Sequence, residues 1–345
     1  MPTWGDILTE IMALVPRDPK AFDDVRRKYL TSLHGHVGRD VILYATSFTS
    51  ALPPGAPANI TSITDEDLQG FMEAVNGLKS KKLDLILHSP GGSAETAEAI
   101  VSYLRSKFDD IRVIVPSLAM SAATMLACAA DVVLMGNHSF LGPIDPQMLI
   151  TTPLGQRMAP AQAILDQFDQ ALAECQDPAK LRAWLPMLGQ YGPDLLVQCK
   201  NASEKSQELV ETWLKQYMFA KDKDGPKKAK AIASWLGSHQ HFKSHGRHIS
   251  RDELTAKGLN VSPLESNHKT QDLVLSVFHA TMILFNTNSI VKIVENHLGK
   301  AWMKRVAPPQ MMMPQMILQG PLQPGQPGPP GQPGGPPLPM PPNNP

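Results

Sequence analysis

The sequence predicts an α/β fold, in which helices cover a mainly parallel sheet. Over residues 40–135, short apolar strand-like segments alternate with amphipathic helical segments at the spacing of βαβ units. From residue 159 to residue 303 the periodicity becomes mostly helical, which adds C-terminal helices to that sheet. A length of 345 residues with an apolar share of 42% is sufficient for one large domain with appended segments.

Each element of this fold follows from a local pattern. Apolar residues from Phe22 to Leu30 recur at helical spacing and predict a helix that ends near Gly35 to Gly38. An apolar run from Leu273 to Phe285 indicates a later helix in the core or at a subunit contact, and the last helical pattern closes at residues 302–305. Strands are expected at residues 40–46, 83–88, 111–115 and 131–135, and helices at residues 65–78, 94–107 and 122–130.

Three parts are expected along the chain. Residues 1–39 form an N-terminal helical segment, and residues 40–306 form the main domain with its helical additions. Residues 307–345 are rich in Pro, Gly, Gln and Met. Such a composition cannot bury enough apolar surface to offset its ordering entropy. We therefore expect a disordered tail there, which is suited to docking a partner.

Charge and cysteine content exclude several classes of function. The 32 basic and 32 acidic residues balance, so no electrostatic attraction to nucleic acid or acidic membranes is predicted. The three cysteines lack metal-ligand spacing, and Cys128 and Cys175 lie in apolar helix-like stretches typical of reduced core thiols. Asp6 and Glu10 stand where a signal peptide would be basic and then apolar. No stretch approaches the roughly 20 apolar residues of a membrane span, so a cytoplasmic protein is expected.

The first segment that carries chemistry is His-Ser-Pro-Gly-Gly-Ser-Ala at residues 88–94, between a predicted strand and a predicted helix. Gly91 and Gly92 permit positive φ angles and a close backbone approach, so that N–H groups can converge on one point. The segment lacks the Lys-Ser/Thr ending of a P-loop and the spacing of a dinucleotide fingerprint. An oxyanion hole and a simple tight turn remain as the two interpretations.

The second segment, residues 115–125, places Ser121 where a buried strand turns into a helix of very small residues. A serine at that position is usually a helix cap. The same helix start offers free N–H groups and the positive end of the dipole, which favour an alkoxide and a tetrahedral oxyanion. Because the two segments follow consecutive strands of a parallel sheet, we expect them at the same edge.

Together these segments resemble the Clp protease and signal peptide peptidase A superfamily, and within it the serine dehydrogenase proteinase family. The resemblance covers most of residues 4–302 and excludes the tail. One departure is Ala123, where the family usually has glycine and where the added methyl could narrow the pocket. The stretches that carry the resemblance are residues 85–92, 115–116, 119–125, 135–136, 141–147, 213–219, 245–249 and 295–297.

The resemblance implies a Clp protease/crotonase-like fold and a serine endopeptidase that needs no cofactor. Ser121 would attack the scissile carbonyl, and the N–H groups of Gly92 and Ala122 would bind the oxyanion, with Gly91 shaping the turn. The strip beyond Gly92 would hold a peptide or unfolded protein substrate by strand addition. A homo-oligomer is expected by analogy with related folds.

The general base stays open at this point. Signal peptide peptidases use a downstream lysine, which must be neutral and therefore desolvated, and Lys200 comes roughly at that position. A Ser-Lys dyad is the first expectation, although a solvated surface lysine would explain Lys200 equally well. Clp proteases use His and Asp instead. Their histidine aligns near Asp145 and their aspartate near His245, so His245 is a rival partner that Asp145 could orient.

Other interpretations concern metal and function class. Four histidines at residues 239–248 could suggest zinc, but a polar turn without metal is preferred because no clear second ligand pair stands out. Crotonase-type acyl-CoA hydratases share the fold, but they need no serine at the helix start, so Ser121 counts against that class. A non-catalytic, peptide-binding oligomeric scaffold that presents the Pro-rich tail to partners is the more serious alternative.

Overall fold

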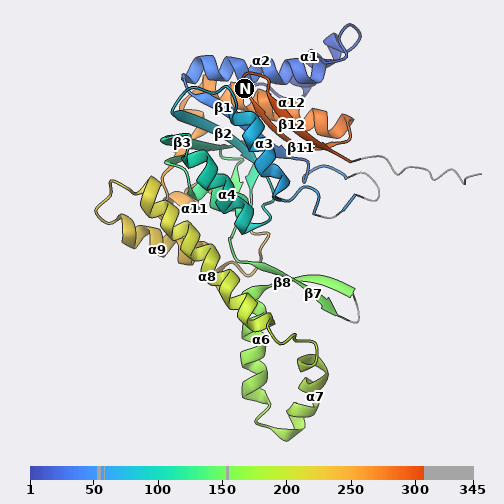
Figure 1. Ribbon diagram of the computed structural model, residues 1–345, viewed down its shortest axis with the longest axis vertical. Coiled ribbons are helices and arrows are strands. Elements are labelled where there is room, and N and C mark those ends of the chain that lie inside the picture. The colour runs from blue at the N-terminus through green and yellow to red at the C-terminus, as the bar shows by residue number, and fades with distance from the viewer. Residues whose placement is uncertain (53–55, 58, 153–154, 307–345) are drawn as a thin grey trace, which may run out of the picture. The chain divides into compact units, whose positions relative to one another are not determined.

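A seven-stranded mixed sheet forms the centre of the protein (Figure 1). The computed structural model describes residues 1–52, 56–57, 59–152 and 155–306, so the tail expected at residues 307–345 lies outside the described residues. The strand order is β10-β5-β3-β2-β1-β11-β12. The strands are β1 (Asp40–Thr46), β2 (Lys82–His88), β3 (Asp110–Val115), β5 (Val132–Met135), β10 (Val261–Pro263), β11 (Ile290–Asn296) and β12 (Ala301–Arg305).

Neighbouring strands from β10 to β1 are parallel, whereas β11 pairs antiparallel with both β1 and β12. The expected fold class, a mainly parallel sheet covered by helices, is therefore confirmed. The four strands expected between residues 40 and 135 are all present, within one or two residues of their expected ends. Strand length and apolar character were sufficient signals there because each strand is followed by a clear turn.

Helices cover both faces of the sheet. Ile42 and Tyr44 of β1 pack under the helices of the βαβ units, whereas Val41 and Leu43 pack under the N-terminal helices and the long C-terminal helix. This alternation follows from the two-residue period of a strand. The helices of the first face are α3 (Glu66–Val75), α4 (Ala94–Arg105) and α5 (Ala122–Cys128), and those of the second are α1 (Trp4–Leu14), α2 (Ala21–Val37) and α12 (His268–Thr287).

The C-terminal half adds helices and two small sheets. A hairpin of β7 (Gln147–Thr152) and β8 (Gly155–Pro160) precedes the helical part, and β4 (Leu118–Ala119), β6 (Phe140–Leu141) and β9 (Ile249–Ser250) pair into a small sheet. The helices are α6 (Ala161–Glu174), α7 (Pro178–Leu188), α8 (Leu195–Trp213), a π-helical turn (Leu214–Met218), α9 (Gly225–Leu236), α10 (His239–Phe242), α11 (Arg251–Ala256) and a 3-10 turn (Leu264–Ser266).

The end of the folded chain differs from the sequence-based expectation. Residues 302–305 were expected to close a helix, but they belong to β12, which pairs with β11. The expectation was wrong because Lys292 interrupts an otherwise strand-like apolar run, Ile-Val-Lys-Ile-Val. In the structure Lys292 is fully buried, so the charge that breaks the pattern does not mark a surface position.

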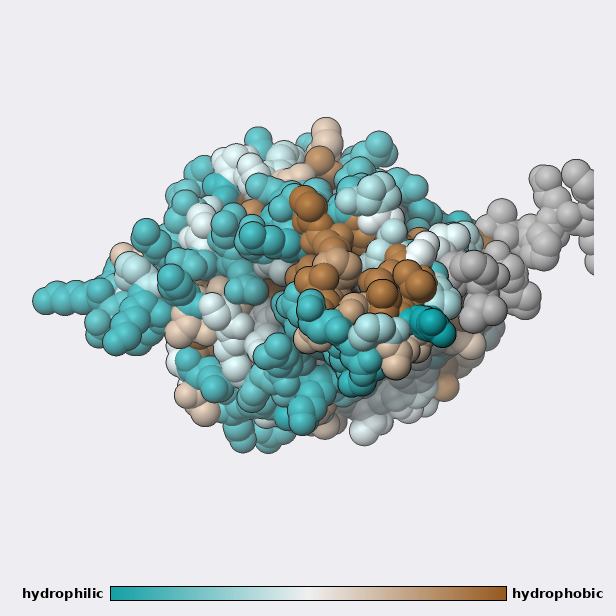
Figure 2. Space-filling model, turned by 90° about the horizontal axis from the view of Figure 1, so that it is seen from below, coloured by the Kyte–Doolittle hydropathy of each residue, from teal (hydrophilic) through white to brown (hydrophobic). Residues whose placement is uncertain are grey.

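Exposed apolar side chains are concentrated on the hairpin and on α6 to α8. Figure 2 views the molecule from the side of α6 and α7, and apolar surface (brown) gathers on that face. Such a surface is typical of a protein contact. The exposed apolar residues of these elements are Leu149, Met158, Leu172, Leu181, Leu185, Met187 and Val197.

Two further properties bear on the class of protein. Within the described ranges, no helix is both long enough and apolar enough to cross a membrane. The cysteines are free thiols, and Cys128 is buried in the core as the sequence indicated, whereas Cys175 is partly exposed. Burial raises the pKa of the Cys128 thiol to about 12, so it is unreactive at neutral pH.

Candidate active site

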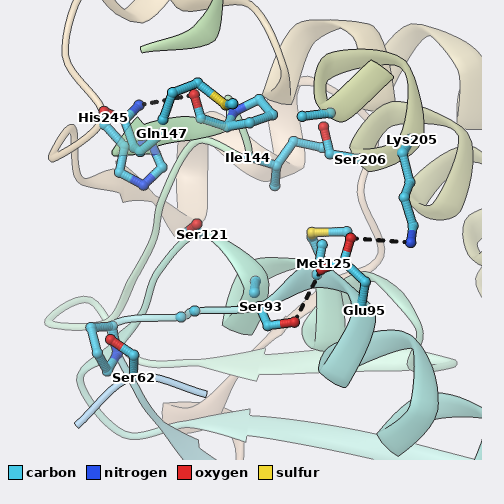
Figure 3. Close-up of a pocket in the computed structure, with 18 of the residues that line it drawn as sticks. Ser62, Ser93, Glu95, Ser121, Met125, Ile144, Gln147, Lys205, Ser206 and His245 are labelled. Atoms are coloured by element: carbon cyan, nitrogen blue, oxygen red, sulfur yellow. Dashed lines mark hydrogen bonds and ion pairs between the residues drawn. The ribbon is translucent and has the colours of Figure 1, made fainter. Parts of the chain in front are cut away.

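A cavity of about 570 Å³ lies at the carboxyl ends of β2 and β3 (Figure 3). Its walls come from the turn after β2, the start of α5, the β7–β8 hairpin, α8 and the loop that follows α10. Five residues singled out from the sequence line it: Gly91, Gly92, Ser121, Ala122 and His245. The expectation that the two loops meet at one edge of the sheet is therefore confirmed.

Ser121 has an unusual backbone conformation. Its φ is 53° and its ψ is −121°, and in the described part of the chain only Lys243 shares a positive φ among residues other than glycine. Ser121 is the N-cap residue of α5, yet its side chain makes no capping hydrogen bond. Capping alone therefore does not explain this serine. Strained, positive-φ serines at a strand-to-helix turn are typical of nucleophiles, because the turn exposes the hydroxyl.

Three other N-cap serines of the chain make the capping hydrogen bond that Ser121 lacks. Ser93, Ser238 and Ser250 are also N-cap residues, and each accepts a hydrogen bond from an N–H group three residues later. Ser121 instead lines the cavity with its side chain, as Figure 3 shows. Its hydroxyl is thus available to a bound molecule.

Glycine is required at both positions of the turn after β2. A Cβ atom on Gly91, whose φ is 90°, would lie 2.5 Å from the carbonyl oxygen of Met120 and 2.7 Å from the nitrogen of Ala122. A Cβ atom on Gly92 would lie 2.4 Å from the backbone of Ile63. The turn after β2 and the start of α5 are therefore in direct backbone contact, which only glycine permits.

Two N–H groups in this region are free. Gly91 accepts a hydrogen bond from Ile63 N (2.7 Å), and Ser93 N donates to Ile63 O (3.0 Å). The N–H of Gly92 points to the opposite edge, because alternate residues of an extended strip face opposite sides. Among the described residues, neither Gly92 N nor Ala122 N has a hydrogen-bond partner. Both could donate to a negatively charged oxygen in the cavity.

The hydrogen bonds of Ile63 also change the expectation for substrate binding. The strip beyond Gly92 was expected to hold a substrate by strand addition. However, Ile63 already takes the N–H of Ser93, and the chain enters α4 at Ala94. Only the edge of Gly92 that faces away from Ile63 is open to an extended peptide.

Asp145 and His245 form a pair beside the cavity. Asp145 is 2% exposed, and its Oδ1 lies 2.8 Å from Nδ1 of His245. An ionised carboxylate only accepts hydrogen bonds, so Nδ1 of His245 must donate, and the neutral ring then carries its lone pair on Nε2. No described residue bonds that Nε2. Figure 3 shows the His245 ring on the same side of the cavity as Ser121.

Asp145 has two further partners. Its Oδ2 accepts from Nδ1 of His239 at 3.0 Å and from Nε2 of Gln147 at 3.1 Å. His239 was considered in the sequence only as part of a histidine-rich turn. Its link to Asp145 depends on the folding of α10 against the loop before β7, and no sequence pattern announces that contact.

Lys200 lies outside the cavity. Its side chain is 70% exposed on α8, with Glu204 at 3.9 Å, and it is not among the residues that line the cavity. A lysine base needs desolvation, which this position does not supply. Lys205 does line the cavity, but its Nζ pairs with Glu95 (3.2 Å) and Glu98 (3.5 Å). The hydrogen bond that the Lys205 ammonium donates to Glu95 raises the pKa of Lys205, which keeps the ammonium protonated.

Comparison with known proteins identifies the family. Residues 59–274 match the family described as ClpP-like SDH-type serine proteinases. The chain belongs to this family. Membership confirms the resemblance that the two loops indicated, and it covers both loops, Asp145 and His245.

Two relatives of the ClpP-like chain are uncharacterised proteins of Methanocaldococcus jannaschii. One is 34% identical over 200 residues, which span 58% of this chain and 60% of the relative. The other is 32% identical over 201 residues, 58% of this chain and 59% of the relative. The chain thus matches about three fifths of the length of these relatives. A mutant of the 1510-N membrane-bound stomatin-specific protease aligns with 58% of this chain and 75% of its own, at 12% identity and a TM-score of 0.34.

The departure at Ala123 does not affect the cavity. Ala123 is 0% exposed and packs in the main core, and it is not one of the residues that line the cavity. The expectation that its methyl could narrow the pocket was wrong, because the first turn of α5 points this side chain away from the cavity.

Metal-ligating side chains converge elsewhere. Within the described ranges, one group of three could approach an ion: His34, Asp40 and His297, whose ligand atoms lie within 4.8 Å of one another. The two imidazoles are stacked with centroids 3.7 Å apart and planes 6° apart. Lone pairs of parallel rings do not converge on one ion, so this arrangement fits a packing contact better than a metal centre.

Proposed function

We propose that the protein is a serine peptidase in which Ser121 is the nucleophile and His245, oriented by Asp145, is the general base. One observation carries the proposal: a serine with positive φ and an uncapped hydroxyl lines the same cavity as a histidine whose Nδ1 bonds a buried aspartate. Nucleophile, base and orienting group are the three parts of a hydrolytic triad. The Ser-Lys dyad expected from the sequence has less support, since Lys200 is exposed and outside the cavity.

The proposed reaction uses groups of this chain alone. Nε2 of His245 accepts the hydroxyl proton of Ser121 as Oγ forms a bond with the carbonyl carbon of the peptide. The oxyanion of the tetrahedral intermediate accepts hydrogen bonds from Gly92 N–H and Ala122 N–H. Asp145 stabilises the imidazolium through its bond to Nδ1.

The second half of the reaction reverses the proton transfer. His245 donates its proton to the leaving nitrogen as the C–N bond breaks, which leaves an acyl group on Ser121. A water molecule then gives a proton to His245 and attacks the acyl carbon. The bond between that carbon and Oγ of Ser121 breaks, and His245 returns its proton to Oγ, which releases the carboxylic acid and restores the serine hydroxyl. No cofactor enters this scheme.

Substrate and assembly belong to the same proposal. The cavity wall includes Met125, Ile144, Met148 and Met158, which suit an apolar side chain of a peptide or an unfolded protein. The exposed apolar residues on α6 to α8 support a homo-oligomer as the working form. A cytoplasmic location and a docking role for the tail stay predictions from the sequence.

The test is intact-protein mass spectrometry after treatment with a fluorophosphonate probe, which reacts only with an activated serine. We expect one adduct on the wild-type chain and none on Ser121→Ala. His245→Ala should slow labelling by about 10²–10⁴-fold, because the general base is lost. Lys200→Ala is the matched control and should label at the wild-type rate.

Two results would redirect the proposal. Loss of labelling in Lys200→Ala with normal labelling in His245→Ala would restore the Ser-Lys dyad. A folded wild-type chain that binds peptides but takes up no probe would favour the non-catalytic scaffold.

A further inference from the structure

Lys292 is a fully buried ammonium that the proposed reaction does not use. It lies in the middle of β11, and its side chain is 0% exposed. Its Nζ donates to the carbonyl oxygen of Ser62 at 2.5 Å and to Oγ1 of Thr64 at 3.2 Å. The two carboxylate oxygens of Asp67 lie 2.9 and 3.0 Å from the same nitrogen.

Asp67 is equally well satisfied. Besides Lys292, its carboxylate accepts hydrogen bonds from the hydroxyl of Tyr44 and from the N–H of Thr64, both at 2.9 Å. Buried charges persist in proteins when they are paired and hydrogen-bonded in this way. The pair therefore joins β11, β1 and the loop before α3 at a single point.

This point lies next to the cavity. Ser62 lines the cavity, and Ile63, between the two residues that Lys292 holds, pairs with Gly92 in a short parallel bridge. Figure 3 shows Ser62 at the edge of the cavity on the side of the turn after β2. In the described part of the chain, the backbone of Ile63 is the sole hydrogen-bond partner of Gly91 O and of Ser93 N, the two groups that flank Gly92.

We propose that Lys292 is a positioning residue for the oxyanion hole: it clamps residues 62–64 against the turn after β2 and so aims the N–H of Gly92 into the cavity. This inference rests on the proposed peptidase function. The chain of contacts runs from Lys292 Nζ to Ser62 O and Thr64 Oγ1, then through the Ile63 backbone to Gly91 O and Ser93 N.

A charged clamp suits this position for a physical reason. An apolar residue on β11 would leave the carbonyl of Ser62 unpaired and the buried carboxylate of Asp67 without its counter-charge. The sheet fixes β11 through its pairing with β1, so the ammonium transmits the rigidity of the sheet to a loop. Small displacements of an oxyanion donor lower catalytic rates strongly, because the donor must meet the developing charge at hydrogen-bond distance.

The test uses a double variant, Lys292→Met with Asp67→Asn, so that neither charge is left buried without a partner. The matched control is Arg26→Met with Glu295→Gln. Arg26 of α2 and Glu295 of β11 form another fully buried ion pair, and Glu295 faces the opposite side of the sheet from Lys292. Both double variants lose a fully buried pair, and the control also loses the contacts of Arg26 with Asp23 and of Glu295 with Arg27. Only the first variant changes groups that contact residues 62–64.

The first measurement is amide hydrogen exchange, which does not depend on catalysis. In the Lys292/Asp67 variant we expect exchange at Ile63 and Ser93 to become at least about 10-fold faster relative to amides of β3, and to be unchanged in the control. Unchanged exchange at these two amides would overturn the proposal. If the double variant does not fold, Thr64→Val provides the test, because it is isosteric and keeps the ion pair. It should speed exchange at Ile63 by about 3-fold.

The second measurement is the rate of fluorophosphonate labelling, with KM for a peptide measured beside it. We expect labelling and kcat to fall at least about 10-fold, with KM changed less, because the loss is confined to the oxyanion contact. A folded variant that labels at the wild-type rate would overturn the positioning role. A wild-type chain that takes up no probe would instead refute the proposed peptidase, and the exchange data would still decide whether Lys292 holds the loop.

Discussion

Nδ1 of His245 lies 2.8 Å from Oδ1 of Asp145, although 100 positions separate the two residues in the chain. The carboxylate is almost fully buried, whereas the ring reaches the cavity that Ser121 lines. This contact orients the imidazole and selects the tautomer whose Nε2 can accept a proton.

Asp145→Asn should weaken catalysis without unfolding the protein. An amide can offer its NH₂ group to Nδ1, which favours the wrong tautomer of His245. We expect the labelling rate of Ser121 to fall by about 10²–10⁴-fold. Loss of the charged acceptor should lower the free energy of unfolding by about 1–3 kcal/mol. Labelling at the wild-type rate in the folded variant would contradict the assigned role.

His239→Ala should have a smaller effect in the same direction. His239 donates to the other oxygen of Asp145, so its removal leaves that oxygen to Gln147 alone. We expect labelling to slow by about 10-fold, because the carboxylate is less firmly oriented. His241→Ala is the control on the same short helix, where His241 contacts Trp235 and Phe242 instead of Asp145. Equal rates for the two variants would show that His239 does not orient Asp145.

Gly91→Ala should abolish labelling and destabilise the fold. A methyl group there would meet backbone atoms of Met120 and Ala122 at a φ of 90°. We expect the free energy of unfolding to fall by about 1–3 kcal/mol. Gly35→Ala is the control: Gly35 lies inside α2 with open space around it, so alanine should raise the free energy of unfolding by about 0.5–1 kcal/mol. Urea unfolding of both variants measures the change in the free energy of unfolding, and probe labelling of Gly91→Ala measures the loss of reactivity at Ser121.

His88 should make the fold sensitive to acid. Burial lowers the pKa of His88 from 6.5 to about 3. Between pH 6.5 and pH 3, His88 is therefore protonated in the unfolded chain and neutral in the folded chain. The contribution of His88 is complete above pH 6.5 and is lost as the pH falls towards 3, by about 1.4 kcal/mol per pH unit. Burial also lowers the pKa of His279 and His297, which adds to the same trend.

Urea unfolding between pH 7 and pH 4 checks this linkage. In His88→Gln the free energy of unfolding should fall less steeply with decreasing pH than in the wild type. The slopes should differ by about 1.4 kcal/mol per pH unit, the contribution of one proton. His268→Gln, at an exposed position, is the control and should keep the wild-type slope. An unchanged slope in His88→Gln would mean that this histidine is not the group that titrates.

The sequence alone was sufficient for the elements that local patterns specify. The alternation of strands and helices over residues 40–135, the turn at Gly91 and Gly92, and the place of Ser121 at the start of a small-residue helix were all predicted, and the family match followed from them. These features depend on neighbours within a few positions, where strand period, turn chemistry and helix starts act directly.

The tertiary structure alone decided which distant groups meet. Asp145 contacts His239 and His245, Lys200 is left on an exposed helix face, and Lys292 reaches a loop 228 to 230 positions earlier in the chain. No local pattern encodes these contacts, because they depend on how whole elements pack. For the same reason, the charge of Lys292 led to a wrong assignment of the last strands. A charge inside an apolar run is buried only when the folded chain brings a carboxylate to it, and that contact is not local. Ser121 could thus be found in the sequence, which left its base open between Lys200 and His245; the contacts and exposure of these two side chains in the fold are what support the proposal of His245.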